Sequence, residues 1–144
     1  MPDPQFRFST TWTVIWRDLD ALGHVNNAVY FTYLEYARMQ YLREVVGLSL
    51  QNPQSAGIIL AEAACTYRSP LSLGERVTIW ARVSQMRNSS FVFEYRLEGE
   101  DGRLVATART VQACYEYAAG RPVPIPQAWR EAITAYEPGL QEVD

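Results

Sequence analysis

The feature that most constrains the fold is one change of hydrophobic period along the chain. From Ala28 to Val46, apolar residues recur every three or four positions, which predicts an amphipathic helix. The stripe consists of Tyr30, Leu34, Ala37, Tyr41 and Val45. After residue 56 the period falls to two, which predicts strands. These segments are Gly57–Tyr67, Arg76–Met86, Ser90–Gly99 and Arg103–Tyr117. One helix followed by a run of strands predicts an α+β domain.

The segments around this core have their own signals. Phe6–Trp16 alternates and predicts a first strand, whose inward side chains would be Phe6, Phe8, Trp12, Val14 and Trp16. Asp18–Asn27 breaks the pattern and predicts a loop, in which Asn26 or Asn27 can cap the helix. Gly47 is a natural helix stop. Gln51–Ala56 is a polar connection, Glu98–Gly102 has the composition of a hairpin turn, and Gln127–Ala135 is a short helical candidate.

One helix cannot cover both faces of a sheet of this size. The economical arrangement wraps a curved antiparallel sheet around the helix, within a single domain spanning residues 1–144. The uncovered face or edge then needs a partner. We therefore expect a homo-oligomer, either a dimer or a tetramer.

Composition excludes several classes of protein. The net charge of −3 argues against a broad nucleic-acid-binding surface. No apolar run approaches the roughly 20 residues of a membrane span, and the N-terminus lacks the basic and apolar pattern of a signal peptide. Cys65 and Cys114 have no metal-ligand spacing, and we expect both to be free and buried. These observations predict a cytoplasmic protein without a metal site.

The densest polar cluster is Asp18–Asn27, which holds two carboxylates, the only histidine and two adjacent amides. A loop carboxylate beside a helix N-terminus can act as nucleophile or general base, and the helix amides favour developing negative charge. The same residue types also serve as helix caps and loop hydrogen-bonding groups. The residues alone leave both interpretations open.

The segment Trp16–Tyr30 resembles the signature of the 4-hydroxybenzoyl-CoA thioesterase family of the hotdog superfamily: Asp-x-Asp, Gly-His-Val, then amides leading to an aromatic residue on the helix. Further similar motifs follow in order at residues 31–38, 67–70, 74–75, 87–91, 101–106 and 120–126. The resemblance implies a hotdog fold and an acyl-CoA thioesterase, which releases a free acid and coenzyme A. It implies no separate cofactor, because coenzyme A is part of the substrate.

The resemblance also implies roles in the loop. Asp20 would be the catalytic carboxylate, attacking the thioester carbonyl or activating water, and Asp18 would support the loop. His24 would either assist catalysis or order the loop. Asn27 would cap the helix or orient a water molecule. Plant acyl-carrier-protein thioesterases have a similar segment, but here Leu22 stands where they have a functional asparagine.

Substrate contacts are implied elsewhere. A backbone amide near Ser55–Ile58, with Gly57 at its centre, would bind the oxyanion. Because the chain has no lysine, arginine must hold the coenzyme A phosphates. The phosphate candidates are Arg87, Asn88, Ser89 and Ser90 of one hairpin, with Arg68 and Arg121. The acyl pocket would lie between the helix and a neighbouring subunit, lined by Tyr30, Tyr33, Leu34 and Ile59.

Other functions compete with this one. A hotdog domain could bind an acyl thioester without cleaving it, although such a domain has no need for Asp20. A hydratase or dehydratase would place Asp and His later in the chain, whereas the only histidine here is His24. Hydrolysis of acyl-carrier-protein thioesters would need a basic docking patch, for which the arginines are sparse.

Overall fold

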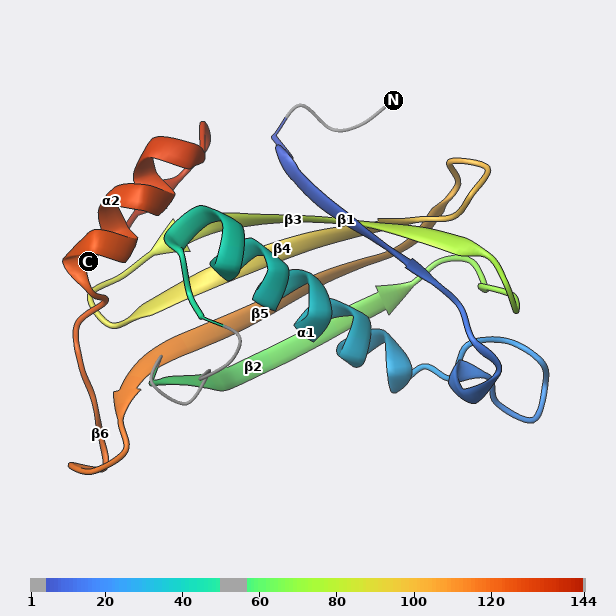
Figure 1. Cartoon of the computed structure of the whole chain (residues 1–144), viewed down its shortest axis with the longest axis horizontal. Coiled ribbons are helices and arrows are strands. Elements are labelled where there is room, and N and C mark those ends of the chain that lie inside the picture. Colours follow the sequence, from blue (N-terminus) through green and yellow to red (C-terminus); the bar gives the residue numbers. More distant parts are fainter. Residues whose placement is uncertain (1–4, 50–56, 144) are drawn as a thin grey trace.

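The computed structural model describes residues 5–49 and 57–143. Its main sheet is antiparallel and curved, and the long helix α1 (Val29–Tyr41) lies across the concave face (Figure 1). The strand order is β1-β3-β4-β5-β2. The strands are β1 (Phe8–Thr13), β2 (Ile58–Tyr67), β3 (Arg76–Met86), β4 (Ser90–Glu98) and β5 (Leu104–Glu116). This is the sheet wrapped around a helix that the change of period predicts.

The core forms where the two periods meet. Alternate residues of β3 and β4 point to the concave face and are buried, as are the helix residues that face them. They are Val77, Ile79, Ala81, Val83, Phe91, Phe93, Tyr95 and Leu97, against Tyr30, Leu34, Ala37 and Tyr41. Four of the five residues in the predicted helix stripe are therefore fully in the core, and Val45 is half-buried.

The end of the long helix differs from a regular α-helix. Leu42–Val46 continues α1 as a π-helical turn, and Gly47 ends it with φ of 78°. The Gly47 amide donates to the Arg43 carbonyl and the Leu48 amide to that of Leu42, so the last carbonyls are satisfied. The second helix, α2 (Gln127–Tyr136), lies at the far end of the sheet, with the short strands β6 (Arg121–Pro122) and β7 (Gln141–Glu142).

The first strand is shorter than its alternation predicts. It ends at Thr13, and Trp16–Asp18 forms a 3-10 turn in which the Trp16 side chain is 79% exposed. The prediction that Trp16 points inward is therefore wrong. The cause is Asp18, whose buried carboxylate accepts hydrogen bonds from the Ile15 amide and the Trp12 indole and so turns the chain.

Other predictions have mixed outcomes. Both cysteines are free; Cys114 is buried as expected, but Cys65 is only half-buried. The connection Gln51–Ala56 lies outside the described residues. In the described ranges, no helix is long and apolar enough to cross a membrane.

Candidate active site

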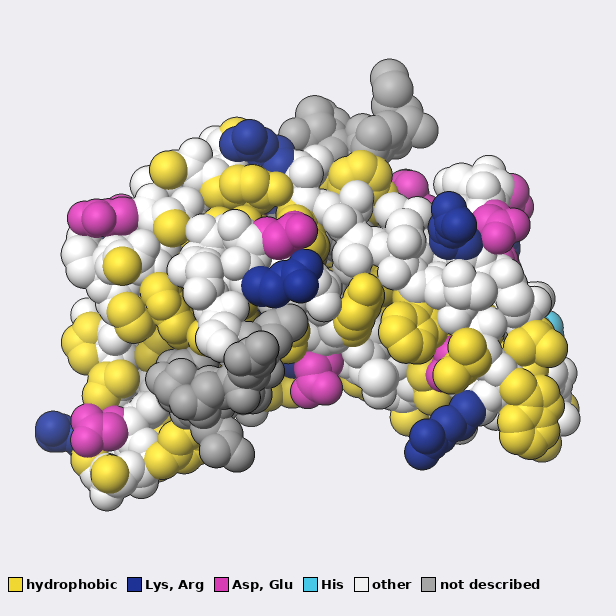
Figure 2. Space-filling view, viewed as in Figure 1, with side chains coloured by type: hydrophobic (Ala, Val, Ile, Leu, Met, Phe, Trp, Pro, Cys, Tyr) yellow, Lys and Arg dark blue, Asp and Glu magenta, His cyan; other side chains and the backbone are white. Residues whose placement is uncertain are grey.

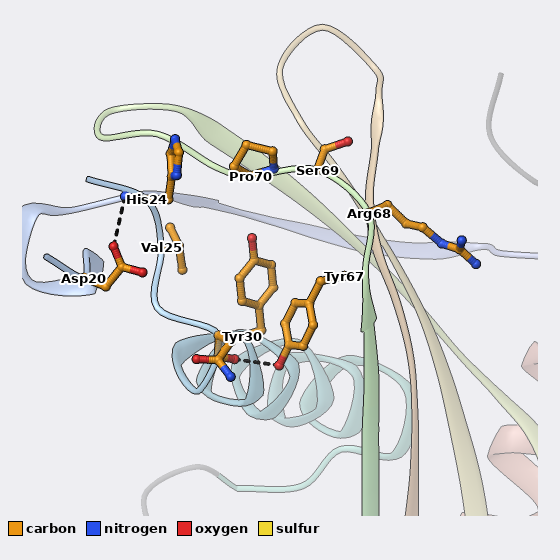
Figure 3. Close-up of a pocket in the computed structure, with 9 residues that line it drawn as sticks. Asp20, His24, Val25, Tyr30, Tyr67, Arg68, Ser69 and Pro70 are labelled. Atoms are coloured by element: carbon orange, nitrogen blue, oxygen red, sulfur yellow. Dashed lines mark hydrogen bonds between the residues drawn. The ribbon is translucent and has the colours of Figure 1, made fainter. Parts of the chain in front are cut away.

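A cleft of about 350 Å³ opens at the start of α1. It is formed by the loop before the helix, the first helical turn and the end of β2 with the residues that follow. Its lining residues are Asp20, His24, Val25, Asn27, Tyr30, Tyr67, Arg68, Ser69 and Pro70 (Figure 3). The fold thus brings together five predicted site residues, namely Asp20, His24, Asn27, Tyr30 and Arg68.

The loop that carries Asp20 is a tight hairpin. Leu19 and Val25 form a β-bridge, the Asp20 amide donates to the His24 carbonyl over 2.8 Å, and Gly23 takes the left-handed conformation that the turn needs. The Asp20 Oδ1 accepts the Leu22 amide at 2.8 Å and the His24 amide at 3.4 Å. No group of the described chain donates to Oδ2. One oxygen of the carboxylate is therefore held, and the other is free to react.

Asp18 has a different environment from Asp20. It is buried, and its Oδ2 accepts hydrogen bonds from the Trp12 indole, the Ile15 amide and the Tyr33 hydroxyl at 2.8–3.2 Å. Burial and the hydrogen bond to Asp18 both raise the pKa of Tyr33. Asp18 therefore ties the loop to β1 and α1, which is the supporting arrangement expected for it.

The two amides before the helix are distinguished by their contacts. The Asn26 side chain caps the turn, since its Oδ1 accepts the Ala28 amide at 2.9 Å. The Asn27 side chain has no partner among the described residues and lines the cleft. His24 contacts Asp20 through its backbone amide, and Figure 3 shows its imidazole pointing away from the Asp20 carboxylate.

Tyr67, Ser69 and Pro70 line the cleft although they were not among the predicted site residues. The Tyr67 hydroxyl donates to the Asn27 carbonyl over 2.8 Å, and its ring packs edge-on against Tyr30 with centroids 5.0 Å apart. Burial raises the pKa of Tyr30 to about 12 and also raises the pKa of Tyr67, so both tyrosines are neutral at neutral pH. The signal for Tyr67 in the sequence was its position at the end of a strand, directly before Arg68.

Several predicted site residues lie elsewhere. Tyr33 and Leu34 are in the core. Gly57 and Ile59 are at the opposite end of β2 from Tyr67, about 30 Å away at the rise of a strand. Gly57 has a packing role there: a Cβ would lie 2.5 Å from the Tyr115 carbonyl oxygen. Ser55 and Ala56 lie outside the described residues.

The predicted phosphate-binding residues are divided between the two ends of the sheet. Arg68 borders the cleft, but Figure 3 shows its guanidinium directed away from Asp20. The hairpin of Arg87, Asn88, Ser89 and Ser90 joins β3 to β4 at the end opposite the cleft, on the same side as Arg121 in β6 (Figure 1). Within one chain, the length of β3, about 35 Å at the rise of a strand, separates the hairpin from the end of the sheet where the cleft lies.

Residues 14–133 match the sequence pattern of the Thioesterase-like superfamily. An acyl-acyl carrier protein thioesterase of Arabidopsis thaliana is 31% identical over 83% of this chain, which spans only 63% of that relative. An acyl-CoA thioesterase of Haemophilus influenzae is 27% identical over 88% of this chain and 93% of its own length.

Solved structures agree with these sequence matches. A thioesterase of Thermus thermophilus complexed with coenzyme A and Zn has a TM-score of 0.81 and 33% identity, covering 92% of this chain and 96% of that one. The shared architecture confirms the hotdog fold that the resemblance implied.

Proposed function

The chain belongs to the Thioesterase-like superfamily, and we propose that it hydrolyses an acyl-coenzyme A thioester to a free acid and coenzyme A, with Asp20 as the catalytic residue. The named acyl-CoA thioesterases among its relatives support this reaction. The observation that carries the proposal is the Asp20 carboxylate, held through Oδ1 by two loop amides and free at Oδ2, at the edge of a cleft.

Asp20 can act by either of two routes through the same oxygen. As nucleophile, Oδ2 bonds to the thioester carbonyl carbon, the C–S bond breaks, and the thiolate of coenzyme A leaves and takes a proton; water then hydrolyses the mixed anhydride. As general base, Oδ2 takes a proton from the water that attacks the same carbon. Neither route needs a cofactor beyond the coenzyme A of the substrate.

The oxyanion is assigned to the N-terminus of α1. In the described chain the amides of Asn26, Ala28 and Val29 are used in the turn, whereas that of Asn27 donates to no acceptor. Asn27 lines the cleft beside Asp20, and helix N-termini favour negative charge. We prefer this amide to the one near Gly57, because β2 holds Gly57 at the far end of the sheet.

The phosphates of coenzyme A are assigned to the Arg87 hairpin of a second copy of the chain. Arg87 and Asn88 of the hairpin are exposed, and its backbone is held by the Arg130 guanidinium, which donates to the Arg87 carbonyl over 2.5 Å. A homo-oligomer is part of this proposal. The cytoplasmic location stays a prediction.

The test is steady-state hydrolysis of a panel of acyl-CoA thioesters, with free thiol as the readout. Asp20→Asn should lower kcat by about a hundredfold or more, since it removes the base or nucleophile, and it should leave the fold unchanged. Asp101→Asn, the same change in an exposed hairpin, should keep full activity. An active Asp20→Asn variant would refute the mechanism. Wild type that binds acyl-CoA without turnover would indicate an acyl-binding domain instead.

Acyl-carrier-protein thioesters are a second candidate substrate, favoured by the similarity to the Arabidopsis enzyme. Exposed Arg68 lines the cleft, and exposed Arg17 lines a neighbouring pocket that shares Asp20 with it, so both could contact an acidic carrier. The same acyl group should be offered on coenzyme A and on acyl carrier protein. The larger kcat/KM identifies the substrate class.

A further inference from the structure

A second pocket, of about 200 Å³, lies farther along α1, between the helix and the first half of β2. Most of its wall is apolar, formed by Met39, Leu42, Leu48, Ile58 and Leu60. Its polar residues are Arg38 and Gln112, both buried, and Glu35, which is exposed to solvent. The described part of the pocket is therefore an apolar wall around a buried cation.

Arg38 carries a charge that has no counterion among the residues that the structure describes. Its residue exposure is 8%, and it takes part in no ion pair within the described ranges. Its one hydrogen bond there runs from Nη1 to the Tyr95 hydroxyl over 3.1 Å. Guanidinium stays protonated in proteins and offers further N–H donors from the same plane. Burying such a group unpaired is costly, so a buried arginine normally has a carboxylate partner.

Of the neighbouring polar side chains, only Tyr95 accepts a hydrogen bond from Arg38 within the described ranges. Tyr95 Oη lies 2.6 Å from Thr110 Oγ1, Thr110 donates to Gln112 Oε1 at 2.5 Å, and the Gln112 amide donates to the Phe91 carbonyl at 3.0 Å. Since Thr110 uses its hydrogen on Gln112, Tyr95 must be the donor to Thr110. Burial raises the pKa of Tyr95, which keeps that proton in place. Tyr95, Thr110 and Gln112 thus each donate their hydrogen bond to a group other than Arg38.

The remaining nitrogens of Arg38 are open to the pocket. Among the described side chains, only Arg82 Nε is both enclosed and without a partner. Nε and Nη2 of Arg38 are therefore not sealed within the protein. Glu35 does not satisfy them, since it forms no ion pair with Arg38, and its exposed charge is screened by solvent.

The pocket and the Asp20 cleft share two elements. Tyr30 of the cleft and Arg38 of the pocket are both on α1, about 12 Å apart along its axis, and β2 contributes Tyr67 to the cleft and Leu60 to the pocket. A cavity of about 150 Å³ can hold a benzene ring, so this pocket has room for the last few atoms of an acyl chain. Both sites lie between α1 and β2, so an acyl group that follows this seam away from Asp20 runs toward Arg38.

We propose that this pocket binds the far end of the acyl group, and that Arg38 selects acyl groups bearing a terminal carboxylate. This inference rests on the proposed thioesterase function and adds a substrate class to it. A carboxylate matches the planar fork of guanidinium and supplies the missing counterion, while the apolar wall binds the methylene groups before it.

The experiment compares two coenzyme A thioesters of equal medium chain length, one of a monocarboxylic acid and one of the matching dicarboxylic acid. Wild type should prefer the dicarboxylic substrate. Arg38→Met, which keeps the volume apolar, should lower kcat/KM for that substrate roughly 10- to 150-fold, the range for hydrogen bonds to charged groups. It should change the monocarboxylic substrate less than about threefold. Arg43→Met, at an exposed arginine one turn later, should alter neither.

A second variant keeps the inference testable if Arg38→Met does not fold. Met39 is half-buried in the pocket wall, so Met39→Trp can fill the pocket while Arg38 stays in place, and it should abolish the preference for the dicarboxylic substrate. Equal effects on both substrates, or wild type without the preference, would overturn the inference while the monocarboxylic activity still supports the proposed function. Wild type inactive on every thioester would overturn both.

Discussion

Two aspartates two positions apart have different tasks because their surroundings differ. Asp18 is buried under three hydrogen-bond donors, and Asp20 has one oxygen fixed and one free. Residue types and their position before a helix left a catalytic and a structural role open for this loop, and the structure brings its Asp20, His24 and Asn27 to one cleft. Arg38 could not be predicted in this way, because its role depends on Tyr95, Thr110 and Gln112, which come from strands more than fifty positions away.

At this scale we predict that Asp18→Asn destabilises the fold. An amide oxygen cannot replace a carboxylate oxygen that accepts three hydrogen bonds, so the free energy of unfolding should fall by about 1–3 kcal/mol. Tyr33→Phe removes one of those donors and should cost about 1 kcal/mol. Urea denaturation of both variants beside Asp20→Asn measures this. If Asp18→Asn is as stable as wild type and Asp20→Asn is the unstable one, the two roles are reversed.

The elements were predictable where hydrophobic period alone determines them. The strands from Arg76 to Met86 and from Ser90 onward follow it, because alternate residues are buried on one face. The prediction for the first strand was wrong at Trp16. The alternating pattern continues through Trp16 in the sequence, but the hydrogen bond from the Ile15 amide to Asp18 has already turned the backbone. The π-helical turn at Leu42–Val46 also could not be predicted, because no hydrophobic period in the sequence distinguishes it from the α-helix before it. It lies where α2 packs against the helix, which is a tertiary contact.

The contact between α2 and the core predicts a pH effect on stability. Glu137 follows α2, is buried, and accepts hydrogen bonds from the Tyr41 hydroxyl and the Val83 amide. Burial raises the pKa of its carboxyl above the ordinary 4.5, although those bonds and the charges of Arg82 and Arg7 oppose the rise. The folded state then binds the proton more tightly than the unfolded chain. Stability is therefore lost as the pH rises from about 4.5 through the folded pKa.

Glu137→Gln keeps an acceptor oxygen and does not titrate. Its free energy of unfolding, relative to wild type, should increase over that pH range by about 1.4 kcal/mol for each pH unit separating the folded and unfolded pKa values. Urea unfolding of both proteins from pH 4 upward gives the difference. A difference that stays constant, or that decreases with pH, contradicts a raised pKa for Glu137.

The whole molecule leaves one long strand edge uncovered. In the described chain β2 pairs with β5 alone, and its side chains are exposed along most of its length, including Leu60 and Tyr67. Exposed apolar side chains also occur at the loop end, where Trp16 is 79% and Leu22 85% exposed, and Figure 2 shows hydrophobic side chains gathered there. Ten-residue edges and apolar patches of this kind are normally covered by another chain.

The position of the Arg87 hairpin also predicts an oligomer, in this case from the active site. The loop before α1, which carries Asp20, and the hairpin between β3 and β4, which carries Arg87, lie at opposite ends of the sheet (Figure 1), so we expect a site that uses both to combine two copies. Arg87→Ala alone should raise KM for an acyl-CoA but not for the corresponding pantetheine thioester, which lacks the phosphates. Asp20→Asn and Arg87→Ala, co-expressed with different tags and purified as a mixed dimer, should together regain activity at low substrate concentration.

The recovery follows from the symmetry of a dimer. In the mixed species one site loses both residues, and the other keeps Asp20 from one chain and Arg87 from its partner. Random pairing should therefore restore about a quarter of wild-type activity, and the purified mixed dimer about half. If both residues served a site within one chain, each mixed dimer would hold one inactive and one impaired site, and mixing would restore nothing. Sedimentation of the wild type as a stable monomer would exclude the shared site before any mixing is done.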